Sequence, residues 1–440
     1  MKRRNMFFKA MSINLIFSLL FLSLVNFNSF ASENEDKEEV VFISTQVELY
    51  TLIQEVNEGN TFKGQHIKLV NDINLTSNEL VDGRSISYVP IGYSSLGNKF
   101  LKKWLKNFTS NLLTRNRSFE GTFDGNGYTI NCNIKNFKKV SDRYTAGALF
   151  GCIGKNGIIK NLNVSGKITS KENQVALAGI CDNNFGLIEN CHVRANIAGE
   201  VGACGICNKN YGMINNCSSK GRITSKDYTC AGIANYNYST IKNCDVSSTI
   251  VNCVDKGLQG NNTFKNPETA GICSFNYGVV SNCSVNSHIN NKNIDSNFNY
   301  NQYILNQSDE VQKWNDGSAG GIVSTNNGLI EDCSVSGSIN AYKLGGIVAK
   351  NYESIKNCKV DGNLTGAIVG GVVAQNVAGD KRISSEFVFW KKGGFLSGCT
   401  VAGKINSFFL AGNIFCKDYW DDAHTCVQDC TAENLSLNIK

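Results

Sequence analysis

The chain has 440 residues, with 43 Lys and Arg against 37 Asp and Glu, a formal net charge of +6 and only two prolines. Residues 1–31 hold four of the cations and none of the acids, so the remainder carries 39 minus 37, or +2. This balance excludes the generally basic surface that nucleic acid binding requires. We therefore predict no nucleic acid partner.

The first element along the chain is a targeting signal. Cations at positions 2–4 precede the apolar run 13–27, and Ser29 and Ala31 place small residues where a signal peptidase cleaves. An uncleaved anchor is the alternative, but the acidic stretch 33–39 lacks the positive flank typical of an anchor. The pattern predicts a signal peptide over residues 1–31 and a secreted or cell-surface protein.

Residues 32–118 are predicted to form a small α/β cap. Thr45 and Glu48 have the spacing of a capping box and open a short helix, whose apolar side is formed by Leu49, Leu52, Ile53 and Val56. A second, amphipathic helix is predicted over residues 100–115, with Trp104 in its apolar stripe. We expect that stripe to pack on the protein, and membrane contact is the alternative.

Residues 119–435 are dominated by an internal repeat. A glycine in Ala-Gly-Ile or a similar triplet is followed by a cysteine 12 residues later in six copies, which begin at Gly179, Gly205, Gly232, Gly271, Gly321 and Gly346. The cysteines are Cys191, Cys217, Cys244, Cys283, Cys333 and Cys358. A fixed interval that recurs this often indicates a solenoid.

Each copy predicts short strands joined by turns. Ile follows the glycine, a second β-branched residue stands nine positions after the glycine, and an Asn-aromatic-Gly triplet such as 184–186 lies between them. We interpret this triplet as a turn with left-handed backbone. One copy cannot bury its apolar face alone, so copies must stack, with asparagines forming a hydrogen-bonded ladder. The prediction is an all-β fold, a right-handed parallel β-helix.

The residues resemble a known family at this point. "AGICDNNFGLIENCHVRANIAG" and "GGIVSTNNGLIEDCSVSGSI" are similar to GLUG repeats, and "FEGTFDGNGYTI" resembles the segment that leads such arrays. GLUG repeats occur in secreted or surface proteins of bacteria, including adhesins and accessory regions of immunoglobulin A peptidases. The resemblance implies a scaffold rather than a particular chemistry.

The 18 cysteines raise the question of a redox or metal site, because Cys204 and Cys207 form a Cys-x-x-Cys pair. Equivalent copies have Ala or Val at these positions, so we predict that both cysteines pack as small apolar side chains. Stacked coils keep equivalent Cβ atoms about 4.8 Å apart, beyond the ~3.8 Å typical of a disulfide. We expect most ladder cysteines to be unpaired and buried.

Catalytic constellations are not evident. The histidines at positions 66, 192, 288 and 424 lie in unrelated places, and the motif His-Glu-x-x-His does not occur. Glu189 and Glu331 share a column but are predicted to lie about four coils, or ~19 Å, apart, too far for a glycosidase pair. Asp124-Gly125-Asn126-Gly127 is predicted to be a turn rather than a calcium loop. We predict no cofactor, no metal and no catalytic residue.

Three insertions interrupt the repeats, at residues 253–269, 289–317 and 380–394. The first two extend the same turn of successive coils and should meet on one side. Aromatic residues of the insertions and of the 100–115 helix are the candidate ligand contacts: Phe298, Tyr300, Tyr303, Trp314, Trp390 and Trp104.

We expect an exported bacterial protein that is not an enzyme and recognises a host or cell-surface glycan or protein. A carbohydrate-active β-helix enzyme, a polysaccharide lyase or hydrolase, is the alternative.

Overall fold

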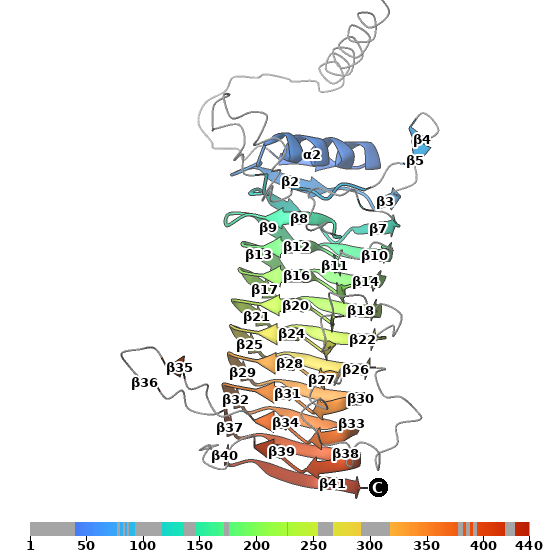
Figure 1. Cartoon of the computed structure of the whole chain (residues 1–440). Helices are drawn as coiled ribbons and strands as arrows, with labels where there is room; N and C mark the ends of the chain where they lie inside the picture. The colour runs from blue at the N-terminus through green and yellow to red at the C-terminus, as the bar shows by residue number, and fades with distance from the viewer. Residues whose placement is uncertain are drawn as a thin grey trace, which may run out of the picture. The chain divides into compact units, whose positions relative to one another are not determined.

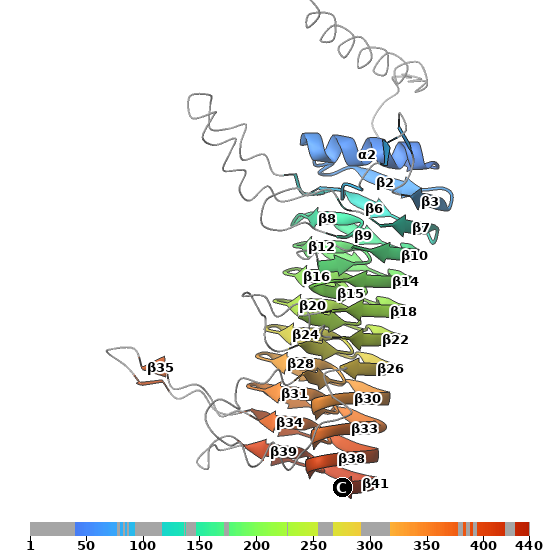
Figure 2. The same ribbon diagram turned by 45° about the vertical axis from the view of Figure 1, so that its right-hand side comes forward.

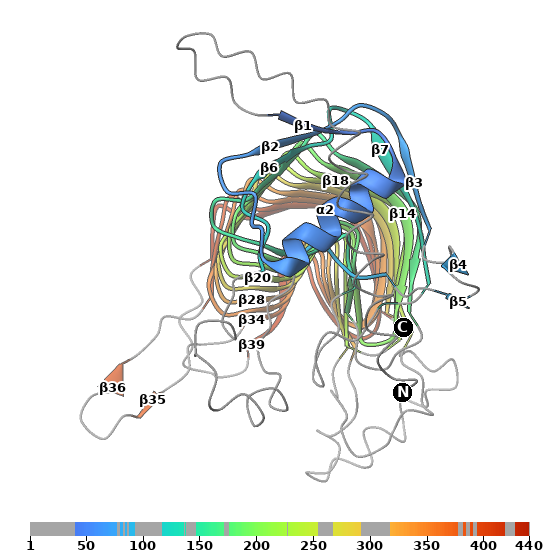
Figure 3. The same ribbon diagram turned by 90° about the horizontal axis from the view of Figure 1, so that it is seen from above.

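The computed structural model describes residues 40–76, 80–81, 84–85, 88–92, 117–135, 137, 147–170, 176–226, 228–253, 267–291, 317–376, 382–383, 388–389, 394–418 and 427–439. The signal peptide prediction and the 100–115 helix lie outside these residues. From residue 40 onward the chain forms a parallel β-helix of stacked coils, with three long parallel sheets along its sides (Figure 1). Seen from the N-terminal end, the chain runs clockwise from β6 to β7 as it recedes, so the coil is right-handed (Figure 3).

Sheet 1 contains one very short strand from each coil. Neighbouring strands pair in parallel and in register, so that Ile188 lies beside Ile214 and Ile214 beside Ile241. The strands are β1 (Val40–Ile43), β2 (His66–Leu69), β6 (Thr122–Asp124), β9 (Ile158–Lys160), β13 (Leu187–Glu189), β17 (Met213–Asn215), β21 (Thr240–Lys242), β25 (Val279–Ser281), β29 (Leu329–Glu331), β32 (Ser354–Lys356), β37 (Phe395–Ser397) and β40 (Val427–Gln428).

Sheet 2 carries the longest strands, which are stacked along one side of the coil in Figure 2. Its main strands are β3 (Ile73–Thr76), β7 (Thr129–Ile134), β10 (Asn163–Thr169), β14 (His192–Gly199), β18 (Ser218–Ser225), β22 (Asp245–Asn252), β26 (Ser284–Asn291), β30 (Ser334–Gly345), β33 (Lys359–Gly370), β38 (Thr400–Gly412) and β41 (Thr431–Ile439). Five short strands end just before the repeat glycine of their coils, such as Gly179 after β11, and we call this position the glycine corner. These strands join sheet 2 through β30: β11 (Ala176–Ala178), β15 (Gly202–Cys204), β19 (Thr229–Ala231), β23 (Glu268–Ala270) and β27 (Ser318–Gly320).

Sheet 3 follows the glycine corner. It consists of β8 (Phe150–Ile153), β12 (Cys181–Asn184), β16 (Cys207–Asn210), β20 (Ala234–Asn237), β24 (Cys273–Asn276), β28 (Val323–Asn326), β31 (Val348–Asn351), β34 (Val373–Asn376) and β39 (Phe415–Asp418). Two antiparallel hairpins lie outside the three sheets, β4 (Leu80–Val81) with β5 (Arg84–Ser85) and β35 (Arg382–Ile383) with β36 (Val388–Phe389).

The predicted asparagine ladder is present inside the coil. Nδ2 of each asparagine donates to Oδ1 of its equivalent in the next coil, at distances of 2.8, 2.9, 2.8, 2.8, 2.9 and 3.0 Å. The ladder runs through Asn184, Asn210, Asn237, Asn276, Asn326, Asn351 and Asn376. A buried amide is expensive unless its hydrogen bonds are made, and here the stacking itself supplies the partner.

The left-handed turn lies at a different place from the predicted one. Asn184 and Gly186 do not have positive φ, whereas Asn190 and its equivalents, immediately before the ladder cysteines, have φ near +50°. The glycine of the triplet serves close stacking instead, because a Cβ on Gly186 would lie 2.1 Å from the carbonyl oxygen of Gly157. Asn and Asp tolerate the left-handed conformation best among residues with a side chain, which explains the Asn-Cys pair of the repeat.

The capping-box helix at the N-terminal end is present as predicted. Helix α2 (Gln46–Glu58) begins with a complete capping box of Thr45 and Glu48 and buries Leu49, Leu52, Ile53 and Val56 over the end of the coil (Figure 1). However, β1 and β2 pair with each other and β2 pairs with β6, so residues before 119 already belong to the sheets. The first turns lack the Gly-to-Cys interval, and therefore the repeat pattern could not reveal them.

Candidate ligand-binding surface

The six predicted ligand contacts, Trp104, Phe298, Tyr300, Tyr303, Trp314 and Trp390, lie outside the described residues. The bases of two insertions are described. The first leaves after β22 and returns at β23, the second leaves after β26 and returns at β27, and these strands pair in the order β22 with β26 and β23 with β27. The two insertions therefore start and end side by side, as predicted. Residues 268–269 and 289–291, assigned to insertions from the sequence, belong to strands.

A ladder of exposed aromatic rings runs along the corner between sheets 3 and 1. Successive ring centroids lie 4.8, 4.7 and 5.2 Å apart, and the rings are within 7° of parallel. The rings belong to Phe185, Tyr211, Tyr238 and Tyr277, which are 41, 40, 41 and 47% exposed. Because each ring covers the face of the next, the ladder presents mainly ring edges and three phenol hydroxyls to solvent.

An aliphatic column lies beside this ladder. Two positions after Phe185, Tyr211 and Tyr277, the outer face of sheet 1 carries Leu187, Met213 and Val279, and Met213 is 36% exposed. Thr240 takes this position after Tyr238. We call these seven residues, Phe185, Tyr211, Tyr238, Tyr277, Leu187, Met213 and Val279, the aromatic stripe. Among the described residues, the other large apolar side chains with comparable exposure lie near the two ends of the coil. Contiguous exposed apolar surface of this kind typically marks an interaction site.

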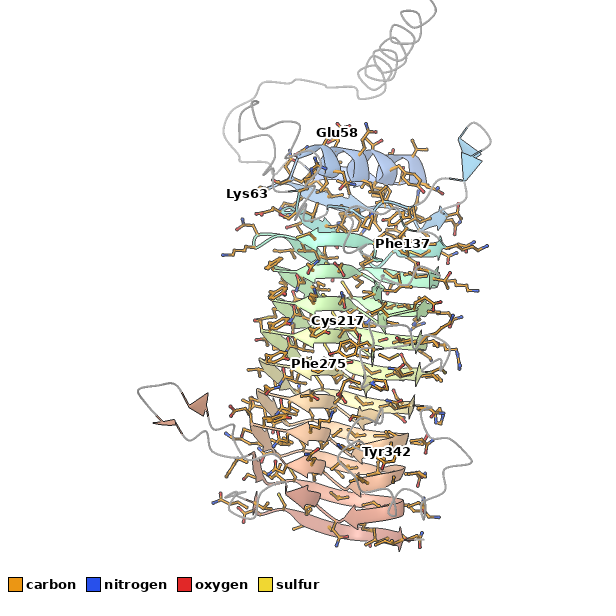
Figure 4. All side chains as sticks on the ribbon, viewed as in Figure 1. Glu58, Lys63, Phe137, Cys217, Phe275 and Tyr342 are labelled. Atoms are coloured by element: carbon orange, nitrogen blue, oxygen red, sulfur yellow. The ribbon has the colours of Figure 1, made fainter. Side chains whose placement is uncertain are left out.

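A second aromatic row borders the stripe on sheet 3. Tyr236 stacks on Phe275 at 5.2 Å and lies 6.2 Å from Tyr238. Phe275, labelled in Figure 4, also lies 5.8 Å from Tyr228. Burial raises the pKa of the Tyr228, Tyr236, Tyr238 and Tyr277 hydroxyls above their ordinary value. These hydroxyls therefore stay protonated at neutral pH and can both donate and accept hydrogen bonds.

A buried carboxylate holds the short strands against sheet 3 next to this row. Glu268, the first residue of β23, accepts hydrogen bonds from Ser324 Oγ, from Thr325 Oγ1 at 3.3 Å and from Lys350 Nζ at 2.9 Å. The Glu268 side chain is 4% exposed and that of Lys350 17%. Removing one partner of a buried ion pair is costly, so this cluster fixes the point where the first insertion re-enters the coil.

The sequence contains a signal for the aromatic stripe. The Asn-aromatic-Gly triplet was interpreted only as a turn, and the recurrence of its aromatic residue was not used to predict a surface. The middle residue of the Asn-x-Gly triplet is aromatic in four successive coils, although nothing in the turn requires a ring there. Tyr236 and Phe275 occupy the position where neighbouring coils have Lys209 and Thr325. Aromatic residues on an outward column, in register over successive coils, are the observation that could have identified this surface.

The two side chains of the Cys-x-x-Cys pair are buried in the coil and pack against apolar neighbours, as predicted. Cys204 packs with Ala148, Ala178 and Ala231 in a small cluster, whereas Cys207 belongs to the main core. Burial raises the pKa of the Cys204 thiol well above its ordinary value, which disfavours the reactive thiolate. The ladder cysteines 191, 217, 244, 283, 333, 358 and 399 are buried free thiols, as predicted. Each donates to the carbonyl oxygen two residues earlier, for example Cys244 Sγ to Lys242 at 3.2 Å.

A shallow depression of about 540 Å³ lies on the outer face of sheet 2. Its lining is polar. Within it, His288 Nδ1 lies 2.6 Å from Ser338 Oγ. The lining residues are Asn286, Ser287, His288, Gly337, Ser338, Asp361, Gly362, Asn363 and Gly403. Within the described part of the chain, no group of three or more His, Cys, Asp or Glu side chains is arranged to hold a metal ion.

Comparison with known proteins gives limited similarity. No family model matches the chain, so the resemblance to GLUG repeats stays a prediction. A protein of Evansella cellulosilytica named "Putative Gly-rich membrane protein" is 32% identical over 165 residues, which make up 37% of this chain and 15% of that protein. The chain thus matches only a small part of that relative. Among the described residues, no helix is long and apolar enough to cross a membrane.

Among solved structures, "a putative immunoglobulin A1 protease" from Bacteroides ovatus aligns over 92% of this chain and 87% of that one. The identity is 13% and the TM-score is 0.37. At this level of similarity the fold assignment rests on the strand pairing of the chain itself, which makes the protein a parallel β-helix.

Proposed function

We propose that this chain is an exported bacterial recognition protein, without catalytic activity, that binds a host or cell-surface glycan or protein through the aromatic stripe. The observation that carries the proposal is the gathering of exposed large apolar side chains in one stripe of the coil. Aromatic residues are enriched among the side chains that dominate binding energy, and a rigid coil holds them in place without an ordering cost. The proposal keeps the candidate contacts of the insertion at 289–317, Phe298, Tyr300, Tyr303 and Trp314, as a separate binding region.

The geometry of the stripe favours a partner with a flat apolar side and hydrogen-bonding groups. Ring faces inside the ladder are covered by neighbouring rings, so a partner meets ring edges, the aliphatic column and the hydroxyls of Tyr211, Tyr238 and Tyr277. Export is supported by the sequence pattern of residues 1–31, and membership of the GLUG repeats remains part of the proposal.

The test is a glycan and host-matrix array probed with residues 32–440. The variant Tyr211→Ser/Tyr238→Ser/Tyr277→Ser should weaken binding of any ligand found by about ten-fold or more, in line with the loss of several interface aromatics. The control Phe42→Ser/Val47→Ser removes two exposed apolar side chains at the N-terminal end and should bind as the parent does. Unchanged binding by the triple variant would show that the stripe is not the site.

The enzymatic alternative receives its support from the depression on sheet 2, where His288 and Ser338 are within hydrogen-bond distance. A base beside a hydroxyl is one part of a nucleophilic site, but within the described residues no carboxylate is hydrogen-bonded to the His288 ring. Assays for polysaccharide and peptide cleavage decide between the two proposals. Cleavage that is lost in His288→Ala would reject the non-catalytic proposal.

A further inference from the structure

On strands β10, β14 and β18 the outer face of sheet 2 differs from the aromatic stripe, because it carries four exposed cations and no large apolar side chain. We call Lys167, Arg194, Lys220 and Arg222 the cationic patch; they lie on the neighbouring strands β10, β14 and β18. Their register is direct: Arg194 lies opposite Lys220, and Lys220 and Arg222 are two positions apart on the same face of one strand. Strand neighbours are about 4.8 Å apart, so the four charges share one small surface.

This arrangement is costly for the folded protein alone. Like charges directly opposite each other on a sheet are destabilising. Three cations elsewhere in the described part of the chain are paired with carboxylates: Lys226 with Glu200 at 2.7 Å, Lys350 with Glu268 at 2.9 Å and Lys160 with Asp124 at 3.8 Å. None of the four patch residues forms an ion pair with another described residue. The nearest acid in the strand register, Asp245, lies at the margin, opposite Ser218 rather than opposite a cation.

The surroundings of the patch suit a hydroxylated polymer. Uncharged amides and hydroxyls of Asn131, Ser165, Asn196 and Ser247 alternate with the cations on the outer face of the same sheet. The polar depression around His288 and Ser338 continues the face toward the C-terminal coils, since β18, β22 and β26 are successive strands. Strands β10, β14 and β18 contain no Phe, Tyr or Trp, so this face lacks the aromatic platform on which proteins that bind single-stranded nucleic acid stack the bases.

We propose that the cationic patch binds an anionic glycan chain, with carboxylate or sulfate groups paired to Arg194, Lys220 and Arg222. Planar guanidinium groups match the geometry of both anions, and neighbouring amides and hydroxyls can bind the sugar hydroxyls. The proposal does not depend on the aromatic stripe, because the two surfaces lie on different sheets.

The experiment uses residues 32–440 with polygalacturonate as the carboxylate probe, heparin as the sulfate probe, dextran as the neutral control and double-stranded DNA as the competing polyanion. At low salt we expect one or both anionic glycans to bind and dextran not to bind. Binding should weaken by about ten-fold or more between 50 and 200 mM NaCl, because paired anions release counterions.

The variant R194Q/K220Q/R222Q should lose about ten-fold or more in affinity. The control K63Q/K155Q/K356Q makes the same change in net charge at exposed sites outside sheet 2 and should lose less than about three-fold. Circular dichroism and melting of both variants verify folding, and Tyr211→Ser/Tyr238→Ser/Tyr277→Ser should bind the anionic glycan normally. The proposal is overturned if neither glycan binds at low salt, or if DNA binds more tightly than either glycan. It is also overturned if the patch variant R194Q/K220Q/R222Q and the control variant lose affinity equally.

Discussion

The asparagine ladder inside the coil and the aromatic stripe outside it are both columns of like residues, but they differ in extent. The ladder continues from Asn184 to Asn376, and each amide is hydrogen-bonded to the next. The ring ladder occupies four coils and ends where Asn327 takes the place of Tyr277. The asparagine column thus spans seven successive coils, between Ile153 before it and Asp418 after it, whereas the stacked rings span four. Confinement therefore indicates that the stripe serves something other than folding.

The largest effect is expected from breaking the interior column. Asn237 donates to Asn276 Oδ1 at 2.8 Å and to two backbone carbonyl oxygens, and it accepts from Asn210. Asn237→Leu leaves several of these buried groups unsatisfied, each worth roughly 1–3 kcal/mol, so we expect a loss of about 3 kcal/mol or more in the free energy of unfolding. Urea denaturation measures it. Asn286→Leu, at an exposed position, is the control. If both variants lost the same small amount of unfolding free energy, the proposed role of the ladder would be contradicted.

A smaller effect is expected from the cysteine column. Cys244 is a buried free thiol in a position that Leu162 occupies in an earlier coil. Cys244→Ala removes one buried sulfur and its weak hydrogen bond, so we expect a loss of about 1–2 kcal/mol with the fold retained. The measurement is urea denaturation followed by circular dichroism. Loss of the β-sheet signal in water would mean that the cysteines have a role beyond packing.

The exterior column should contribute least to stability. Tyr238 is 41% exposed and stacks between Tyr211 and Tyr277. Tyr238→Ser removes two stacked ring contacts, each worth about 0.5–1.5 kcal/mol. Because the rings are partly exposed, we expect the lower limit to apply to each, which gives a loss of about 1 kcal/mol. A melting experiment on this variant beside Asn237→Leu sharpens the comparison. A destabilisation as large as that of Asn237→Leu would make the stripe a structural column after all.

The sequence was informative wherever a residue type had to recur in every coil. The 12-residue interval from Gly232 to Cys244 predicted the stacking, the register and the burial of the cysteines, because these follow from coil geometry. It could not separate a turn from a surface in the triplet 184–186, since both demand the same spacing. The pairing of Glu268 with Lys350 was also hidden, because the two residues are 82 positions apart and meet only when β23 folds against sheet 3.

The smallest expected effect is a pH dependence at the N-terminal side of sheet 3. Burial raises the pKa of the Asp182 carboxyl, while hydrogen bonds from Asn208 and Asn183 and the charge of Lys209 offset part of this increase. The folded protein therefore holds this proton more tightly than the unfolded chain, whose Asp pKa is about 3.9. Stability from this group is complete below that value and is lost as the pH rises through the folded pKa.

Asp182→Asn removes this titration without a change in side-chain size. The difference in unfolding free energy between the parent and Asp182→Asn isolates the group, because the other carboxylates are common to both proteins. Relative to the variant, the parent should be more stable at pH 4 than at pH 7. Urea midpoints at the two pH values measure it. A difference that is constant, or that favours the parent at pH 7, would show that Asn208, Asn183 and Lys209 outweigh burial and that this column of sheet 3 is built to hold a charge.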